Sequence, residues 1–479
     1  MVRRRSSRSR EDPARQSAFE TGILPLLGVS EEANTSVSSY QSLPNDQDIV
    51  RLFEIFRRRV HPFHVITCNL DAIEQRICRL INARGGPDFG SELLEDPRWL
   101  SLLHAILAAG AQFSDMNLQD RLAMSQRHTK QSFDLLPSTD YLAAPSKEAV
   151  HTLLLLGNVL QIDMKPQAAW VLGGTTVRLA QCLGLHKKTA HPTKSPLPDE
   201  EAMVKLAIVW QDALLALAFG RPPGSYELDC EGDLPQLSES VEGSSLSYLQ
   251  AMSWLCHVTL RHLSFHFQSS LRPVSALDSI KSIEACLSPH LIDPTRSAAI
   301  PQIQEHYAFE LHRHFVVATL CRPSECDRSN VLEHFRESLK RSVRAYVRLR
   351  SIAGHASRSW AFIHNGLTSV LLLSLMRETR YLAETRTLQD ELIASFSEGE
   401  VDSALLTESG TNGQLSGTLQ KALKALRTLR ELTERDVSSR GSTLENNSQA
   451  IATPGNLPAV GERPATGQDS AFRVSEQTE

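Results

Sequence analysis

The chain of 479 residues lacks the features that mark membrane and secreted proteins. Its longest apolar runs, "HTLLLLGNVL" and "TSVLLLSLM", are much shorter than the roughly 20 residues that a membrane-spanning helix needs. The first residues, "MVRRRSSRSREDPARQ", contain no apolar segment of the kind that secretory signals carry. We therefore expect an intracellular protein that has no membrane partner.

Motifs for metal binding and catalysis are also missing. No two of the eight cysteines are separated by only two residues, and their apolar helical surroundings favour free, buried thiols in a reducing compartment. The pairs His61 with His64 and His312 with His314 have no further ligand at a suitable spacing. Nucleotide-binding loops, nucleophile elbows and zinc-protease motifs do not occur. These absences predict a protein without a cofactor, a metal or an enzymatic activity.

The net charge of −5 excludes a bulk attraction to nucleic acid, so any such attraction needs a local cluster of basic residues. Such a cluster occurs at the start of the chain, where no acid is present among the first ten residues. Either it serves as a nuclear import signal or a nonspecific phosphate-binding arm, or it is a solvated tail without a function. The cluster consists of Arg3, Arg4, Arg5, Arg8 and Arg10.

From about residue 45 to 385 the apolar residues recur at helical spacing. In "DIVRLFEIFRRRV" the residues Ile49, Leu52, Phe53 and Phe56 form one apolar stripe. "PRWLSLLHAILAAGAQF" and "EAVHTLLLLGNVLQ" are apolar on nearly every side, which predicts buried helices. Strand-like alternation is scarce. The sequence therefore predicts an all-α fold, a large multi-helix array with disordered N- and C-terminal tails.

Composition divides this array into segments. The tails lack enough apolar residues to form a core, and the stretch after residue 385 is rich in Glu, Ser, Thr and Gly. A strongly amphipathic helix, "LQKALKALRTLRELTERDV", follows it, and we expect it either to dock on the main domain or to contact a partner. The predicted segments are a disordered Arg/Ser-rich tail (1–42), the all-α domain (43–385), a loosely packed insertion (386–414), the amphipathic helix (415–437) and a disordered tail (438–479).

The stretch "KPQAAWVLGGTTVRLAQCLGLHKK" contains a Gly-Gly-Thr-Thr run that a phosphate-binding loop would also show. No strand precedes these glycines, and a packing helix explains the pattern better. Gly173 and Gly174 would then lie within the helix, where a second helix approaches closely. Gly184 is expected to end the helix in the left-handed conformation, with Leu185 folding back on the last turn.

Four segments follow one another in order: "LPNDQDIVRLFEIFRRRVHPFH", "HTLLLLGNVLQIDMKPQAAWVLGGTTVRLAQCLGLHKK", "WQDALLALAFGRPPGSYELDCEGDLP" and "HYAFELHRHFVVATLCRP". Together they resemble the fungal-specific transcription factor domain, the middle homology region of fungal zinc-cluster regulators. The resemblance covers roughly residues 43 to 380. It implies an all-α domain that regulates transcription, binds partners or small effectors, and often dimerises.

The sequence departs from this family at two places. Residues 1–42 contain no cysteine, so the six-cysteine zinc cluster that usually precedes this domain is not expected here, unless an upstream exon encodes it. The Arg- and Trp-rich run that family members carry before Asp212 is replaced by "EEAMVKLAIV", and Ala213 stands where a basic residue is expected. Sequence-specific DNA binding through zinc is therefore not predicted.

The resemblance leads to one main hypothesis and one alternative. The main hypothesis is a nuclear transcriptional regulator that controls metabolic or secondary-metabolite biosynthetic genes, through a partner factor or through weak DNA contact. A small-molecule effector and a homo- or heterodimer partner are further expectations. In "GRPP", Gly220 is expected to supply a positive φ and Pro222 to end the helix, while Arg221 either caps helix carbonyls or contacts the effector. The alternative is an intracellular effector-binding or interaction module that takes no direct part in transcription.

Overall fold

A computed structural model describes residues 43–67, 69–84, 96–187, 199–228, 231–237, 245–267, 276–320, 329–355, 358–376, 379–397 and 421–436. Within these ranges the backbone is mostly helical and forms no strand, and extended segments pair only at an isolated parallel bridge between Leu246 and Leu287. The prediction of an all-α fold is confirmed. The predicted tails, residues 1–42 and 438–479, lie outside the described residues.

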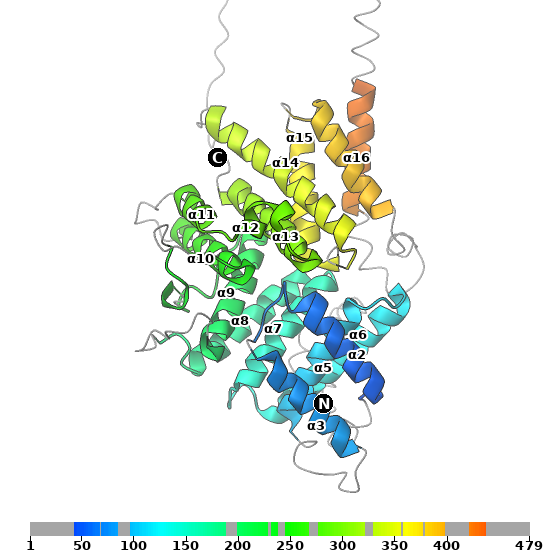
Figure 1. The fold of residues 1–479 in the computed structure, drawn as a ribbon, viewed down its shortest axis with the longest axis vertical. Helices are drawn as coiled ribbons and strands as arrows, with labels where there is room; N and C mark the ends of the chain where they lie inside the picture. The colour runs from blue at the N-terminus through cyan, green and yellow to red at the C-terminus, as the bar shows by residue number, and fades with distance from the viewer. Residues whose placement is uncertain are drawn as a thin grey trace, which may run out of the picture. The chain divides into compact units, whose positions relative to one another are not determined.

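The helices keep the labels of Figure 1. The long helices are α2 (Asp46–Ile55), α3 (Leu70–Arg84), α5 (Pro97–Gln112), α6 (Leu118–Leu135), α7 (Lys147–Ile162), α8 (Pro166–Cys182), α9 (Glu200–Phe219), α10 (Tyr248–Phe267), α11 (Ala276–Ala285), α13 (Ile300–Leu320), α14 (Ser329–Ile352), α15 (Trp360–Leu375) and α16 (Ala383–Ser397). The short ones are the π-helix η2 (Phe56–Val60), α12 (Pro289–Ile292), and the 3-10 turns η3 (Pro137–Thr139), η4 (Glu231–Asp233) and η5 (Pro294–Arg296). Residues 421–436 are also helical.

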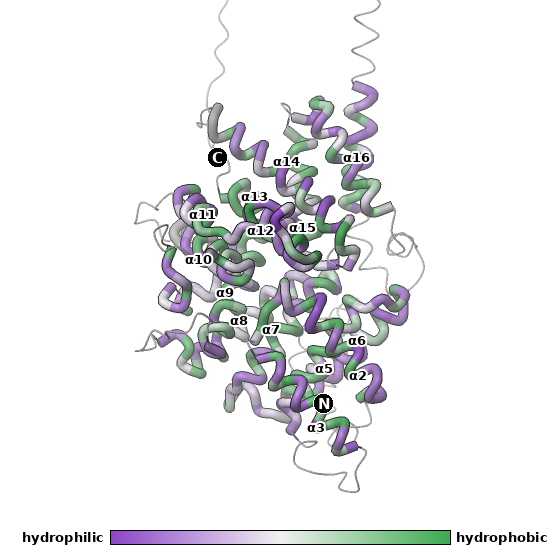
Figure 2. Tube along the Cα trace, in the orientation of Figure 1, coloured by the Kyte–Doolittle hydropathy of each residue, from purple (hydrophilic) through white to green (hydrophobic). Residues whose placement is uncertain are grey.

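Helices that follow one another along the chain pack as pairs. Such pairs are α5 with α6, α7 with α8, α9 with α10, α13 with α14, and α14 with α15. Figure 1 shows α14, α15 and α16 side by side, and these three helices contact one another. Figure 2 shows that α14 alternates between hydrophilic and hydrophobic residues, as expected for a helix with one face in the core and one in solvent.

Helices α5, α7 and α9 form the centre of the core because their sequences are apolar on nearly every side. All residues of α5 from Trp99 onward are buried, and so is most of α7, as their sequences predict. Ile49, Leu52, Phe53 and Phe56, the predicted stripe of the first helix, are buried as well. Helix α9 would suit a membrane by length and composition, but 78% of its apolar window is buried inside the protein, which is typical of a core helix.

Two glycines allow neighbouring helices to approach closely, and neither is in the predicted Gly-Gly pair. A Cβ atom on Gly110 of α5 would lie 2.2 Å from the carbonyl oxygen of Leu52 in α2. A Cβ atom on Gly366 of α15 would lie 2.6 Å from Cγ of Tyr346 in α14. Around Gly173 and Gly174 nothing lies within 4 Å of an added Cβ. The predicted close approach at these two positions is wrong, because they lie on the outward side of α8.

The other predicted features of the Gly-Gly-Thr-Thr stretch are confirmed. Residues Pro166–Cys182 form α8, and Gly184 follows with φ of 81°. The amide of Leu185 donates to the carbonyl oxygen of Ala180 over 3.1 Å, and the Leu185 side chain is buried. This is the Schellman arrangement that the Gly-Leu sequence predicts.

The first half of the segment expected to be a loosely packed insertion is instead helical. Residues 386–397 belong to α16, and Leu388, Leu392 and Phe396 are buried. The prediction for this part is wrong, because apolar residues at helical spacing outweighed the polar composition. The described chain then resumes at residue 421, within the range expected for the amphipathic helix, and Leu423 and Leu426 are buried. One compact unit ends at Arg430, and the second begins at Glu431.

Cysteine burial follows the prediction only in part. Cys256 and Cys286 are buried, whereas Cys78 and Cys182 carry free, exposed thiols on α3 and α8. Cys78 and Cys182 lie on the outward faces of their helices, which the spacing of the cysteines in the sequence does not predict.

Candidate functional site

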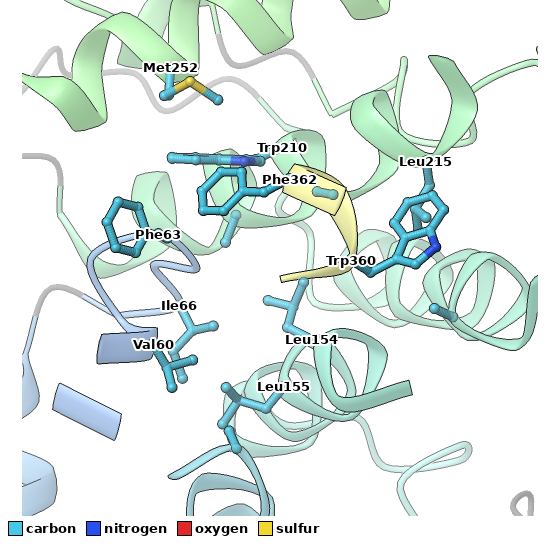
Figure 3. Packing of buried hydrophobic residues seen from close by; sticks show 14 of the residues in the cluster. Val60, Phe63, Ile66, Leu154, Leu155, Trp210, Leu215, Met252, Trp360 and Phe362 are labelled. Atoms are coloured by element: carbon cyan, nitrogen blue, oxygen red, sulfur yellow. The ribbon is translucent and has the colours of Figure 1, made fainter. Parts of the chain in front are cut away.

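A small cavity, lined by apolar residues and a few polar side chains, lies where segments from several parts of the chain meet. Its walls come from residues 63–66 after η2, from α7 and α9, and from single residues of α13 and α15. Its volume is about 30 Å³, which has room for one or two water molecules but not for a metabolite. Figure 3 shows aromatic residues of this region, with Phe63 close to Phe362. Their ring centroids are 5.7 Å apart in an edge-to-face arrangement.

Hydrogen bonds hold the polar side chains of the cavity. The amide of Gln211 donates to the carbonyl oxygen of Leu154 over 3.1 Å and to Oδ1 of Asn158 over 3.2 Å. The amide of Asn365 donates to Nδ1 of His312 over 3.0 Å, which places the ring proton of His312 on Nε2. In contrast, Nε2 of His64 is buried and has no hydrogen-bond partner among the described residues. The cavity therefore keeps unused hydrogen-bonding capacity at His64.

The two histidines of the cavity are neutral at physiological pH. Burial lowers the pKa of His64 to about 4. Burial, and then the neighbouring His64, lower the pKa of His312 to about 3. His61 is separate from them, since its Nε2 bonds to the carbonyl oxygen of Thr67 over 3.0 Å. Within the described ranges, no three His, Cys, Asp or Glu side chains lie close enough to hold a metal ion.

Arg221 stacks on aromatic rings. Gly220 has φ of 60°, as predicted, and the backbone amide of Arg221 donates to the carbonyl oxygen of Ala216 over 3.0 Å. Its guanidinium carbon lies 4.7 Å from the ring centroid of Trp170 and 4.8 Å from that of Phe219. Arg221 therefore caps a helix carbonyl, as expected, and does so through its backbone amide, while its planar guanidinium stacks on the aromatic faces. Contact with an effector stays a prediction.

The stack continues from α9 into α15. The rings of Phe219 and Trp360 are 6.1 Å apart, and those of Trp360 and His364 are 4.8 Å apart and nearly parallel. Ala361, the residue after Trp360, lines the small cavity described above. The "GRPP" segment at the end of α9 is thus connected through aromatic contacts to the wall of the cavity.

Asp212 fixes the segment that follows α9. Its buried Oδ2 accepts a hydrogen bond from the amide of Ser225 over 2.7 Å. Burial raises the pKa of this carboxyl group, while the hydrogen bonds from Ser225 and Gly224 act in the opposite direction. The sequence alone does not predict that Asp212 fixes this segment, because its partners lie 12 and 13 residues further along the chain.

The other predicted residues are distributed over the molecule. Arg3, Arg4, Arg5, Arg8 and Arg10 lie outside the described residues. His312 and His314 point to different surroundings, since Nδ1 of His312 lies beside Asn365 and Nε2 of His314 lies 3.1 Å from a carboxylate oxygen of Glu310. The cavity residues Asn158 and Gln211 were not singled out, because each lies within an apolar helix and only tertiary packing brings them together.

Comparison with known proteins identifies the family. The model of the fungal specific transcription factor domain matches residues 99–341, just over half of the chain. The chain belongs to this family. The matched stretch runs from α5 into α14 and includes Asp212, Arg221 and the α7 and α9 walls of the cavity.

Three curated fungal proteins are similar to parts of the chain. An uncharacterized transcriptional regulatory protein of Schizosaccharomyces pombe is 25% identical over 39% of this chain. The transcription factors macR of Penicillium terrestre and yanR of Aspergillus niger are each 30% identical, over 29% and 27% of this chain. The matched regions span 25%, 18% and 17% of the lengths of these relatives, respectively. The family and the names of these relatives support a role in the regulation of transcription.

Proposed function

We propose that this protein is a non-enzymatic regulator of transcription that acts in the nucleus. The match of the fungal specific transcription factor domain to residues 99–341 carries the proposal. The helical architecture supports it, since paired helices offer surfaces for partners and effectors. In this proposal residues 43–385 form the regulatory domain, and the target genes are metabolic or secondary-metabolite biosynthetic genes, as the family resemblance implies.

The helical surface near the N-terminal end of the described chain favours action through a partner factor. Several arginines of α2 and η2 are paired with acids, so little uncompensated positive charge remains there for DNA phosphates. These pairs are Arg51 with Asp48, Arg57 with Asp71 and Glu74, and Arg58 with Glu54. Any weak, direct DNA contact is therefore assigned to Arg3, Arg4, Arg5, Arg8 and Arg10.

A tethering experiment tests the transcriptional role. Residues 43–437 fused to a heterologous DNA-binding domain should change the expression of a reporter gene in a fungal host. The same fusion without residues 43–437 is the control. Equal reporter expression from both fusions, at equal protein levels, would contradict the proposal and favour an interaction module outside transcription.

Localisation and DNA contact are tested with variants of the first ten residues. Replacing the five arginines by alanine should abolish nuclear accumulation if they form an import signal. If they contact DNA, the slope of log K against log [salt] should become less steep by about 0.9 for each phosphate contact that is lost. The control replaces Ser6, Ser7 and Ser9 by alanine, which leaves the charge unchanged. Cytoplasmic residence of the unchanged protein, unaffected by removal of residues 1–10, would contradict the nuclear assignment.

Two measurements on the purified protein complete the test. Stoichiometric zinc, or sharp sequence-specific DNA binding at physiological salt, would contradict action without a zinc module. Light scattering coupled to size-exclusion chromatography determines whether the protein forms the proposed homodimer. A monomeric mass at all concentrations would contradict the homodimer. The proposal would then require a heterodimer with the partner factor.

A further inference from the structure

Three arginine side chains from distant parts of the chain gather at the C-terminal end of α5. Arg59 comes from the π-helix η2, Arg121 from the start of α6, and Arg358 from the segment just before α15. Their charges act on one another and on Asp115, which lies in the turn between α5 and α6. Among the described residues, Asp115 is the one carboxylate whose charge acts on Arg121 and Arg358.

Carbonyl oxygens at the end of α5 hold two of these arginines. Nη1 of Arg59 donates to the carbonyl oxygen of Phe113 over 2.9 Å, and its guanidinium also pairs with Asp115 at 2.6 Å. Nη1 of Arg358 donates to the carbonyl oxygen of Ser114 over 2.7 Å. These carbonyls lie at the negative end of the helix dipole, where cations are favoured. The helix end therefore explains why Arg59 and Arg358 lie here.

Arg121 has no such compensation. Its exposed fraction is 6%, and no hydrogen bond or ion pair to its guanidinium is found in the part of the chain that the structure describes. Nε of Arg358 is also buried without a hydrogen-bond partner. Burial lowers the pKa of both guanidinium groups, that of Arg358 to about 10, so both are charged at neutral pH. The one opposite charge among the described residues that acts on them, that of Asp115, is shared among three arginines, which leaves buried positive charge only partly compensated.

The local charge balance is positive. Three guanidinium groups face one carboxylate, and the side chain of Asp115 is 77% exposed. The nearby His355 adds no charge, since burial and the charges of Arg59 and Arg358 lower its pKa to about 4. An anion placed among these groups would restore neutrality and occupy the unused donors of Arg121 and Arg358.

We propose that Arg59, Arg121 and Arg358 form a binding site for a small anion that carries a carboxylate or phosphate group. The planar donor pairs of arginine match both groups. Because Arg121 is recessed, a small molecule reaches it more readily than a rigid DNA duplex does. Binding itself is independent of the role in transcription, whereas its use as an effector signal rests on the proposed function.

Thermal shift and calorimetry on the purified full-length protein test the site, with inorganic phosphate and citrate as separate probes in a buffer without other oxyanions. Each binding probe should raise the melting temperature, and the shift should grow with the logarithm of the probe concentration once that concentration exceeds the Kd. R121Q should weaken binding at least about tenfold, the loss expected for one charged hydrogen bond. R127Q, which removes an exposed arginine from the same helix, should leave binding unchanged. D115N should tighten binding, because it removes the competing carboxylate.

The variants separate a binding site from a structural cluster. Without a ligand, R121Q should be at least as stable as the unchanged protein, because it removes a buried charge that Asp115 compensates only in part. A destabilised R121Q together with unchanged binding by D115N would overturn the proposal. So would the absence of binding by both probes up to about 10 mM, a range in which even weak sites are detected. Binding of duplex DNA or an acidic peptide at this cluster, without binding of either small probe, would also overturn it.

Discussion

Arg221 lies over the indole ring of Trp170, with 4.7 Å between its guanidinium carbon and the ring centroid. This contact ties the segment after α9 to the preceding helix α8. Since Phe219 contacts the same guanidinium and also stacks with Trp360, one arginine connects three helices. The "GRPP" segment is therefore a packing junction of the family-matched region.

Loss of this stacking should destabilise the protein modestly. R221M keeps an unbranched side chain but removes the cation, and it should lower the free energy of unfolding by about 1 kcal/mol. R178M is the matched control, because Arg178 is exposed on α8 and donates to Gln181 of the same helix. Thermal unfolding of both variants measures the difference. Equal melting temperatures for the two variants would show that the stacking contributes nothing measurable.

Glycine replacements should have opposite effects at two positions. G110A should destabilise the protein by about 1–3 kcal/mol or prevent folding, since the new Cβ would lie 2.2 Å from the Leu52 carbonyl oxygen. G174A should stabilise it by up to about 1 kcal/mol, because alanine favours the helix and nothing lies within 4 Å of the added Cβ. Urea denaturation measures both effects. A destabilised G174A would mean that α8 requires the glycine for a contact with a partner.

The buried pair His104 and His128 should make the protein sensitive to acid. Their Nδ1 atoms lie 2.9 Å apart, so one ring donates and the other accepts. Burial, followed by the charge of the partner, lowers the pKa of His104 to about 3. Burial, followed by the charge of Arg127, lowers that of His128 to about 4. The unfolded chain, with a histidine pKa near 6.5, therefore binds protons first as the pH falls.

The sign of this effect is a loss of stability on acidification. The contribution is fully present above pH 6.5, and it declines as the pH falls to about 4 for His128 and to about 3 for His104, by at most about 1.4 kcal/mol per pH unit for each histidine. The double variant H104L/H128L replaces both partners by apolar groups and should show a smaller decline. H334Q, at an exposed position of α14, is the control. Urea denaturation at several pH values measures the slopes, and identical slopes for all three proteins would contradict the prediction.

The ion pair between Arg430 and Asp390 should hold the last helical segment on α16. Nε and Nη2 of Arg430 donate to the two carboxylate oxygens of Asp390, each over 2.9 Å. Since the Asp390 side chain is 55% exposed, D390N should cost only about 1 kcal/mol. It should speed amide hydrogen exchange in residues 421–430 and leave α15 unchanged. D278N, which affects a loose surface pair with Lys281, is the control, and equal exchange in both variants would contradict the prediction.

Local features of the chain are determined by nearby residues, and the sequence therefore predicts them. Apolar spacing predicts the buried stripe of α2 and the buried helices α5 and α7. The Gly-Leu pair at residues 184 and 185 predicts a left-handed end, because only nearby backbone groups decide it. The family resemblance rested on such local patterns, and the family comparison confirmed it.

Contacts between distant residues were decided only by the tertiary structure. The sequence does not distinguish Gly110, against which α2 packs, from Gly174, which faces open space. It also does not bring Arg59, Arg121 and Arg358 together, since 62 residues separate the first two and more than 200 lie between the last two. Helix propensity and capping act within a few residues, whereas helix packing depends on which faces meet. The sequence by itself therefore determined where the helices form and end, whereas the tertiary structure decided which residues of different helices come into contact.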